Sequence, residues 1–433
     1  MGLPTLPAGW SYAPLKRVTT VRFSSVDKHS LPEETPVRLC NYLDVYRSEQ
    51  ITRRLEFMQA TASRSEIERF SLLPGDVLLT KDSEEPSDIG VPSCVVEQLD
   101  GVVCGYHLAL VRPRPDVVDG RFLQRSLQAT GIRDQFYARA VGVTRFAIGL
   151  GEVGDALVPV APLMVQHRIA AFLDHKTAAI DQLIQRKERL IELLREKREA
   201  LITQAVTKGL DPNVPKKDSG VGWIGSFPAH WQLRRLKQIA TRLVVGIAQA
   251  ATQAYAASGI PLVRSTNLRR DRLLVDDLLY IDKSFADQLR SKYIRPGDLL
   301  TVRTGNAGVT AVVPPELPIS QCFTMLITTL RQEHSPYFFS LQLNSAIGAT
   351  HFRRESWGTA QENISVPILQ NTPVLVPPPS EQRGIVTMLN ERTANVDAAL
   401  AAVERQTQVL REYRQALISA AVTGQFAVAG DAA

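Results

Sequence analysis

Arginines beside amide and hydroxyl side chains are the groups in this sequence with the most evident chemistry. They gather in RSTNLRRDR (264–272), VRTGNAG (302–308) and HFRRESWGTAQENIS (351–365), and a looser series runs through the first 161 residues. The guanidinium fork can bind phosphate or guanine with two hydrogen bonds, and amides and hydroxyls suit base edges. An ordinary solvated arginine remains the alternative at each position. The candidates for contact with DNA are Arg53, Arg54, Lys81, Arg139, Thr144, Arg145, Arg264, Asn267, Arg269, Arg270, Arg303, Asn306, Arg353, Arg354, Gln361 and Asn363.

The VRTGNAG stretch is the strongest of these candidates for reading bases. Gly305 and Gly308 flank Asn306 and would let the backbone approach a ligand closely. Arg303 and Asn306 are therefore expected to contact base edges. The alternative is that the two glycines only shape a hairpin and that Arg303 lies on an ordinary surface.

Charge is distributed unevenly along the chain. Overall the sequence carries a formal net charge of +6, which permits an anionic partner without requiring one. Residues 6–161 hold 18 Lys and Arg against 20 Asp and Glu, whereas residues 227–379 hold 16 against 10. Nucleic acid bound by the first block would therefore need a local patch. We expect most of the phosphate contact to come from the second block.

Motifs for catalysis or metal binding are not evident in the sequence. GLGEVG (149–154) matches a dinucleotide fingerprint in letters only, because DALVPVAP follows it and cannot open the required helix. The four cysteines form no CxxC pair and are expected to be reduced thiols in a cytosolic protein. No membrane span is expected. We therefore expect no catalytic residue, no metal and no cofactor in this chain.

The sequence contains an internal repeat. An offset of 216 positions aligns residues 166–207 with residues 382–423 without a gap, and AVTKG (205–209) matches AVTG (421–424). LPAGW (6–10) likewise corresponds to FPAHW (227–231), and LPGDVLLT (73–80) to RPGDLLTV (295–302). The intervening blocks differ almost everywhere. One element is therefore reused, while another is adapted to different targets.

Each repeated segment predicts a helix of about 40 residues with an apolar seam at alternating steps of four and three. Two matching seams within one chain favour an antiparallel pair of helices, with a parallel dimer between chains as the alternative. Polar seam residues such as Thr177 and Arg198 would fix the register. The apolar seam positions are Leu173, Ile180, Ile184, Ile191, Leu194 and Leu201 in the first helix, and Leu389, Val396, Leu400, Val403, Leu410 and Leu417 in the second.

The expected fold class is α+β, with an internal pseudo-twofold repeat of two α/β blocks joined by the two long helices. Short β-rich runs separated by turns predict a mostly antiparallel sheet in each block. The expected boundaries are a first block at 1–161, a long helix at 162–210, a linker at 211–226, a second block at 227–379, a long helix at 380–425 and a tail at 426–433.

With these features together, the chain resembles the specificity subunits of type I restriction–modification systems. The most specific stretch runs from Ala205 to Trp231, ending in WIG and PAHW, and is joined by HRIAAFLDHKTAAIDQLI (167–184) and PPPSEQRGIVTMLNERTANVDAAL (377–400). The resemblance implies two target-recognition domains that read an asymmetric two-part DNA site, with the helices setting the gap between the half-sites.

The resemblance further implies partners that do the chemistry. These are double-stranded DNA, two modification (methyltransferase) subunits that carry S-adenosylmethionine and methylate adenine, and restriction or motor subunits that use ATP and Mg. The chain itself would be non-catalytic, cytoplasmic and prokaryotic. Alternatives are a specificity subunit from a restriction–modification enzyme outside type I, a coiled-coil scaffold that does not read DNA, and an enzyme lacking recognisable motifs.

Overall fold

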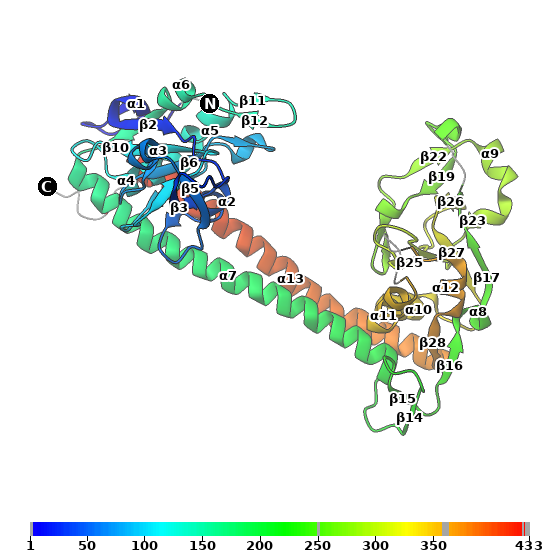
Figure 1. The fold of residues 1–433 in the computed structure, drawn as a ribbon. Helices are drawn as coiled ribbons and strands as arrows, with labels where there is room; N and C mark the ends of the chain where they lie inside the picture. The colour runs from blue at the N-terminus through cyan, green and yellow to red at the C-terminus, as the bar shows by residue number, and fades with distance from the viewer. Residues whose placement is uncertain (1–2, 249–251, 357–362, 427, 429–433) are drawn as a thin grey trace. The chain divides into compact units, whose positions relative to one another are not determined.

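The computed structural model describes residues 3–248, 252–356, 363–426 and 428 and has the expected α+β class, with two long helices (Figure 1). The chain forms two compact units, one of residues 1–188 with 404–433 and the other of residues 189–403. The unit boundaries fall inside the long helices, so each unit holds one half of each helix. Within the described residues no helix is long and apolar enough to cross a membrane.

The first unit is built on a five-stranded sheet in the order β2-β10-β6-β8-β4. Its strand pairs are antiparallel except for β4 with β8, which is parallel. The same unit contains a three-stranded sheet, β5-β3-β9, in which β3 and β9 are parallel. Buried Val, Leu and Ala on β6 and β10 meet Phe122, Leu123 and Leu127 of α4 in the core. The elements are β1 Ser11–Pro14, α1 Leu15–Val18, β2 Thr19–Phe23, β3 Thr35–Cys40, α2 Tyr42–Arg47, β4 Gln50–Ile51, β5 Met58–Ala62, α3 Arg64–Phe70, β6 Val77–Thr80, β7 Asp82–Ser83, β8 Pro92–Val95, β9 Val102–Cys104, β10 Leu108–Pro113, α4 Gly120–Gln128, α5 Asp134–Tyr137, β11 Val141–Gly142, β12 Phe146–Ala147, α6 Leu150–Gly154 and β13 Leu157–Val160.

The second unit repeats this plan with a four-stranded sheet, β17-β27-β24-β25, whose pairs are antiparallel. The helix and strand that end the block repeat at an offset of 216: α10 corresponds to α4 and β28 to β13. Its elements are β14 Lys216–Asp218, β15 Ser226–Pro228, β16 Gln232–Arg235, α8 Leu236–Ile239, β17 Ala240–Val245, β18 Tyr255–Ala256, β19 Ile260–Val263, β20 Leu268–Arg269, β21 Arg272–Leu273, β22 Leu279–Ile281, α9 Lys283–Gln288, β23 Tyr293–Ile294, β24 Leu299–Thr301, β25 Thr310–Val312, β26 Ser320–Cys322, β27 Leu326–Leu330, α10 Pro336–Asn344, α11 Ala346–Glu355, α12 Val366–Asn371 and β28 Pro373–Val376.

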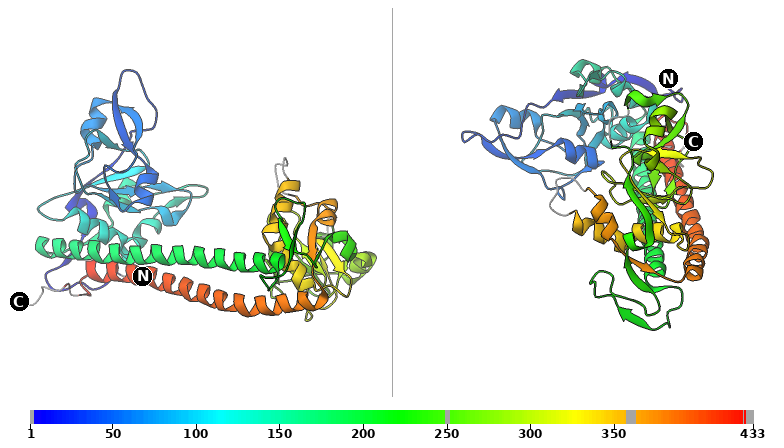
Figure 2. Two further views of the ribbon diagram at one scale, coloured as in Figure 1. Left: turned by 90° about the horizontal axis from the view of Figure 1, so that it is seen from below. Right: turned by 90° about the vertical axis from the view of Figure 1, so that its right-hand side faces the viewer.

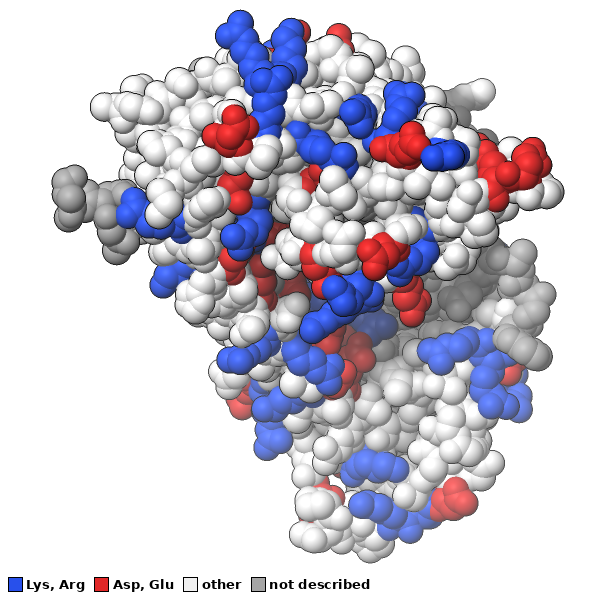
Figure 3. All heavy atoms as spheres, turned by 60° about the vertical axis from the view of Figure 1, so that its left-hand side comes forward, with Lys and Arg blue, Asp and Glu red and all other residues white. Residues whose placement is uncertain are grey.

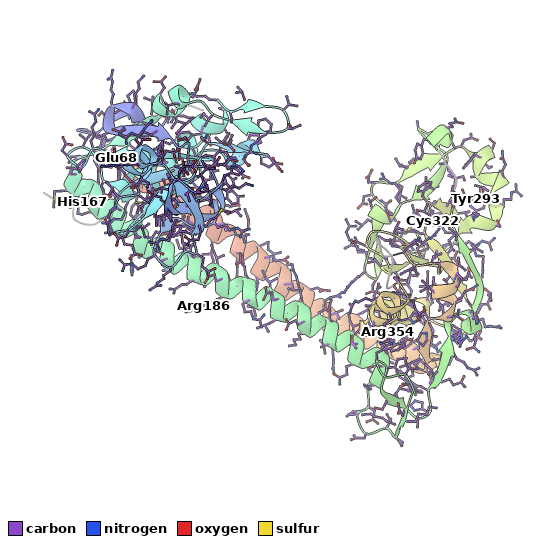
Figure 4. All side chains as sticks on the ribbon, in the orientation of Figure 1. Glu68, His167, Arg186, Tyr293, Cys322 and Arg354 are labelled. Carbon is purple, nitrogen blue, oxygen red and sulfur yellow. The ribbon has the colours of Figure 1, made fainter. Side chains whose placement is uncertain are left out.

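The long helices are α7, Leu163–Lys208 with 46 residues, and α13, Pro379–Val422 with 44 residues. Every apolar seam position is buried or half-buried, and from residue 188 to 197 every position of α7 outside the seam is exposed. Arg186, which lies outside the seam, is exposed on α7 (Figure 4). Within each unit the two helix halves run side by side (Figure 2). The seam is thus the surface through which each pair of helix halves is held.

In the first unit Asp181 and Glu188 of α7 pair with Arg414 and Arg411 of α13, so these two helix halves run antiparallel, and one of the ion pairs recurs in the second unit. In the first unit Arg414 Nε lies 2.7 Å from Asp181 Oδ1, and in the second Arg198 Nε lies 2.7 Å from Asp397 Oδ1. The 216-residue offset converts Arg198 to Arg414 and Asp181 to Asp397, so the two contacts are the same pair with the helices exchanged. Arg198 and Arg414 are seam positions, where polar contacts of this kind can specify the register of two helices.

The repeated motifs at the block ends also have a structural basis. Gly209 and Gly424 follow the helix ends with φ of +72° and +70°, the left-handed conformation that commonly terminates a helix. A β-carbon on Gly209 would lie 3.3 Å from the Trp231 ring, and one on Gly424 would lie 3.5 Å from the Trp10 ring. The absence of a side chain at Gly209 and Gly424 therefore leaves room for the tryptophans of FPAHW and LPAGW to pack against the helix ends.

A buried glutamine ties each block to its helix in the same way. Gln166 Oε1 accepts from the Asp119 backbone N–H at 2.9 Å, and Gln382 Oε1 accepts from the Ser335 N–H at 2.8 Å. Both donor residues are the N-caps of equivalent helices, α4 and α10. Because a buried polar group needs a hydrogen-bond partner, these contacts explain why both repeats have glutamine at this position, and no contact with a ligand needs to be assumed.

The four cysteines, Cys40, Cys94, Cys104 and Cys322, are buried and unpaired. Burial raises the pKa of the Cys94 thiol to about 12, and that of the Cys322 thiol also to about 12. In the part of the chain that the structure describes, no cluster of three His, Cys, Asp or Glu side chains could hold a metal ion.

Candidate nucleic-acid interface

In the first unit, three of the candidates lie at one edge of the domain, where β7 follows β6. β7 pairs with β12, and β12 pairs with β11, so that a short two-stranded ribbon projects from this edge (Figure 1). Lys81 precedes β7, with its ammonium 5.1 Å from the centre of the Phe23 ring. Thr144 and Arg145 occupy the exposed turn of the ribbon. The Arg145 guanidinium pairs with Asp82, and this bond raises the pKa of Arg145.

The second unit has an equivalent edge, built by equivalent hydrogen bonds. The Ile148 N–H donates to the Lys81 carbonyl at 3.0 Å, and the Ile364 N–H donates to the Arg303 carbonyl at 2.9 Å. Thr304 bridges to Asn363 as Asp82 pairs with Ala147. Arg303, Asn306 and Asn363 therefore gather at one edge. Gln361 lies outside the described residues.

The two glycines of the VRTGNAG loop differ in role. A β-carbon on Gly308 would lie 2.6 Å from the Phe352 ring, so this glycine lets the loop pack on α11. Gly305 has φ of +81°, and a β-carbon added there would meet no atom of the described residues within 4 Å, so this glycine shapes an exposed turn. Asn306 is exposed beside it, while Arg303 is half-buried and its Nε has no hydrogen-bond partner among the described residues. One glycine thus supports the fold and the other leaves Asn306 accessible.

The loop at 264–270 mainly bonds to its own unit. Asn267 is buried, its Nδ2 donates to the Asp277 carbonyl at 3.0 Å, and its Oδ1 accepts from the Arg264 N–H at 2.9 Å. Arg264 pairs with Asp277 at 3.2 Å, and Arg269 donates to two backbone carbonyls of the loop. Asn267 therefore holds the loop together and does not present its amide to a ligand.

The remaining candidates are spread over other surfaces of the two units. Arg53 pairs with Glu97 at 2.8 Å beside an exposed Arg54, and Arg139 donates to the Glu152 carbonyl at 3.3 Å. In the second unit Arg353 is exposed on α11, and the Arg354 guanidinium lies 4.7 Å from the centre of the Trp223 ring (Figure 4). Basic and acidic side chains are interspersed on the face drawn in Figure 3. These residues do not join the edges described above.

At the joint between each block and its helices lies a carboxylate whose pKa is shifted by its surroundings. Glu49 in the first unit and Asp271 in the second each precede a short edge strand, and each accepts from an α4 or α10 amide, Gln128 at 2.8 Å and Asn344 at 2.6 Å. Burial raises the pKa of Glu49, but Arg125 and Arg414 outweigh it, so the pKa is lowered. Asp271 makes no such ion pair within the described residues, and burial raises its pKa.

The one-methylene difference between these carboxylates goes with a difference in packing. In the first unit Arg414 donates to Glu49 at 2.6 Å, and Gln415 of α13 donates to the Gln128 carbonyl at 2.8 Å, so the joint is closed. In the second unit Arg270 instead pairs with Glu199 of α7 at 2.7 Å. A cavity of about 770 Å³ lies there, between α7 and α11, with Arg198, Asp271 and Arg353 in its lining. Arg270 is thus engaged with the helix.

Two exposed valines at the first edge were missed by reasoning from the sequence. Val141 and Val143 are 75% and 91% exposed on the β11–β12 ribbon. In the sequence VGVTRFA they suggest an ordinary buried strand. Gly142, with φ of +153° and no room for a β-carbon beside the Arg145 carbonyl, was the available sign of a tight turn.

The repeated fold and its two equivalent edges define a class of modular protein in which two related domains present different residues at the same place. Among curated proteins, the chain is 23% identical over 325 residues, 73% of its length and 67% of the relative, to the EcoBI type I restriction enzyme specificity subunit of Escherichia coli. It is 22% identical over 445 aligned residues, covering 98% of this chain and 91% of the relative, to the EcoKI specificity subunit of Escherichia coli strain K12. No protein-family model matches the chain.

Solved structures share the fold. A chain from a structure on complex assembly and conformational transition of a type I restriction–modification system aligns with a TM-score of 0.72 at 18% identity, covering 98% of this chain and 100% of that one. The HsdS subunit of Thermoanaerobacter tengcongensis aligns with a TM-score of 0.50 at 18% identity, over 97% and 98% of the two chains. In sequence and in fold the chain is therefore similar, over nearly its whole length, to the specificity subunits of type I restriction–modification systems.

Proposed function

We propose that this chain reads a bipartite, asymmetric DNA site, one half with each globular block, and directs adenine methylation or cleavage by partner subunits. The observation that carries the proposal is the pair of equivalent edges. The edge that carries Lys81, Thr144 and Arg145 and the edge that carries Arg303, Asn306 and Asn363 are held by matching backbone hydrogen bonds, with Lys81 and Arg303 at equivalent positions. One scaffold with two sets of side chains suits two different half-sites.

In this proposal the chain itself is not an enzyme. Two modification subunits carrying S-adenosylmethionine, and restriction subunits using ATP and Mg, supply the chemistry, and the chain acts on host DNA in the prokaryotic cytoplasm. The matching outer faces of α7 and α13 would offer the same docking surface to two copies of one partner, because the 216-residue repeat makes the helices alike.

Methyl transfer tests the division of labour directly. The full chain, purified alone, is incubated with genomic DNA and radiolabelled S-adenosylmethionine, and so is the complex isolated through a tag on this chain. We expect label in adenine only with the complex. Label transferred by the chain alone would contradict a non-catalytic role, and a complex that labels DNA without regard to sequence would contradict the role in specificity.

A further inference from the structure

Resting on the proposed function, the structure assigns a base-reading role to the β11–β12 ribbon: we infer that it enters the major groove, where Arg145 binds the edge of a guanine and Val143 contacts a thymine methyl group. The ribbon consists of Val141–Gly142 and Phe146–Ala147, joined by a turn at residues 143–145. A two-stranded ribbon is one of the two elements that the major groove of B-DNA admits.

The exposure of the ribbon supports an interface. Residues 141–145 are all exposed, and Val143 is 91% exposed. Phe146 is half-buried and packs against the core of the first unit, so the ribbon is anchored at its base. Because Val143 is almost fully exposed, it buries little surface within the unit, and valine suits contact with the methyl group by which thymine differs from cytosine in the groove.

The surroundings of Arg145 favour a base over a phosphate as its ligand. Asp82, 13% exposed, pairs with the guanidinium and also lies 2.6 Å from Nδ1 of His107, so it is held on both sides. A hollow of about 460 Å³ beside Arg145 is lined by Glu84, Glu85 and Asp88 as well. These carboxylates repel phosphate, while Asp82 holds the fork in one orientation and leaves 56% of the Arg145 side chain exposed for the two acceptors of guanine.

The counterpart in the second unit indicates that the ribbon sets specificity. The edge is preserved through the Thr304–Asn363 bridge, but the residue equivalent to Arg145 is Gln361 and the one equivalent to Val143 is Thr359, both outside the described residues. At these sequence-equivalent positions the two blocks carry different side chains, as two domains that read different half-sites should.

The experiment is enrichment from a randomised duplex library with the complex isolated through a tag on the full chain. The parent, Arg145→Ala and Val143→Ser are compared, with Arg64→Ala as the matched control, because Arg64 is an exposed arginine that pairs with Glu68 on the same helix. We expect Arg145→Ala to lose preference for one G·C pair by about ten- to hundredfold, and Val143→Ser to lose preference for a neighbouring A·T pair.

Modified bases at the positions so identified give a second readout. With the parent, 7-deazaguanine at the G and deoxyuridine in place of the T should weaken binding, and each effect should vanish in the matching variant. If Arg145→Ala instead weakens binding to all sequences alike and reduces the salt dependence, Arg145 binds phosphate and the inference is wrong. If both variants keep the parent's consensus, the ribbon does not read DNA. A parent that enriches no consensus would contradict the proposed function itself, which is a distinct outcome.

Discussion

Replacing Glu49 with Gln should destabilise the first unit by removing one charge from its joint with the helices. Glu49 accepts hydrogen bonds from Arg125 at 2.7 Å, from Gln128 at 2.8 Å and from Arg414 at 2.6 Å. Arg125 is 3% exposed and would be left with Asp174 at 2.9 Å. The glutamine keeps the shape of the side chain, so the measured change reports the charge.

The magnitude follows from these partners. A hydrogen bond to a charged group contributes about 1.5–3 kcal/mol, and breaking a buried ion pair costs about 3–5 kcal/mol. Glu49 is 35% exposed and each arginine keeps a second carboxylate, so we expect the lower part of this range, about 2–3 kcal/mol. For a unit of this size that lowers Tm by about 5–10 °C. Glu68→Gln, which breaks an exposed pair with Arg64, should cost at most about 0.5 kcal/mol.

Calorimetric unfolding between pH 7 and pH 3.5 provides the assay, with the second unit as internal reference. Because the folded pKa of Glu49 is lowered, its stabilisation is present above the unfolded value and is lost as the pH falls through the folded one. The parent and Glu49→Gln should therefore converge in acid. A variant within about 0.5 kcal/mol of the parent at pH 7, or a difference that does not shrink in acid, would refute this reasoning.

Three further expectations concern the second edge, the helices and the thiols. Arg303→Ala and Asn306→Ala should each weaken binding to the cognate site by about 1–3 kcal/mol and relax the base preference at one position. Arg353→Ala should instead weaken binding to all duplexes alike and lower the log–log salt slope by about one unit. Binding titrations at several salt concentrations, on cognate and scrambled duplexes, distinguish these results, and parent-like binding by the first two variants would show that the loop does not contact DNA. Adding one heptad to both helices should change the length of the DNA spacer that is tolerated between the half-sites and leave both half-site sequences unchanged. Mapping the methylated adenines measures this, and altered half-sites with an unchanged spacer would contradict the expectation. With a pKa of about 12, Cys322 is thiolate in only about one part in ten thousand at pH 8, so a maleimide should label it only on unfolding, and rapid labelling of the native chain would show that the site is open.

The long helices and the repeated plan could be predicted from the sequence because their signals are periodic. Seam positions such as Leu173 and Leu389 recur every seven residues, and the gapless offset of 216 relates the two helices without any knowledge of their contacts. Strands β6 and β24 lie in short apolar runs that follow a Pro-Gly turn, as LPGDVLLT and RPGDLLTV indicate. These features depend on local patterns that tertiary packing reinforces.

The parts that could not be predicted depend on a single contact or on which side of a strand faces water. Asn267 has the composition of a base reader, but its amide is bonded within its own loop. Val141 and Val143 look like core residues because sequence periodicity does not show that a ribbon projects from a sheet edge. Glu49 and Asp271 differ by one methylene, and only the distances reveal that one reaches an arginine of the helix pair and the other does not.

The central claim, that each block reads one half of a two-part site, is tested most directly by exchanging one block. Residues 6–161 are replaced by the corresponding domain of a specificity subunit with a different known site, and methylated adenines are mapped across the genome of cells that also make the modification subunits. We predict that one half-site changes to that of the donor while the other half-site and the spacer stay as they were. A change in both half-sites, or a parent site that is a single uninterrupted sequence, would contradict the claim.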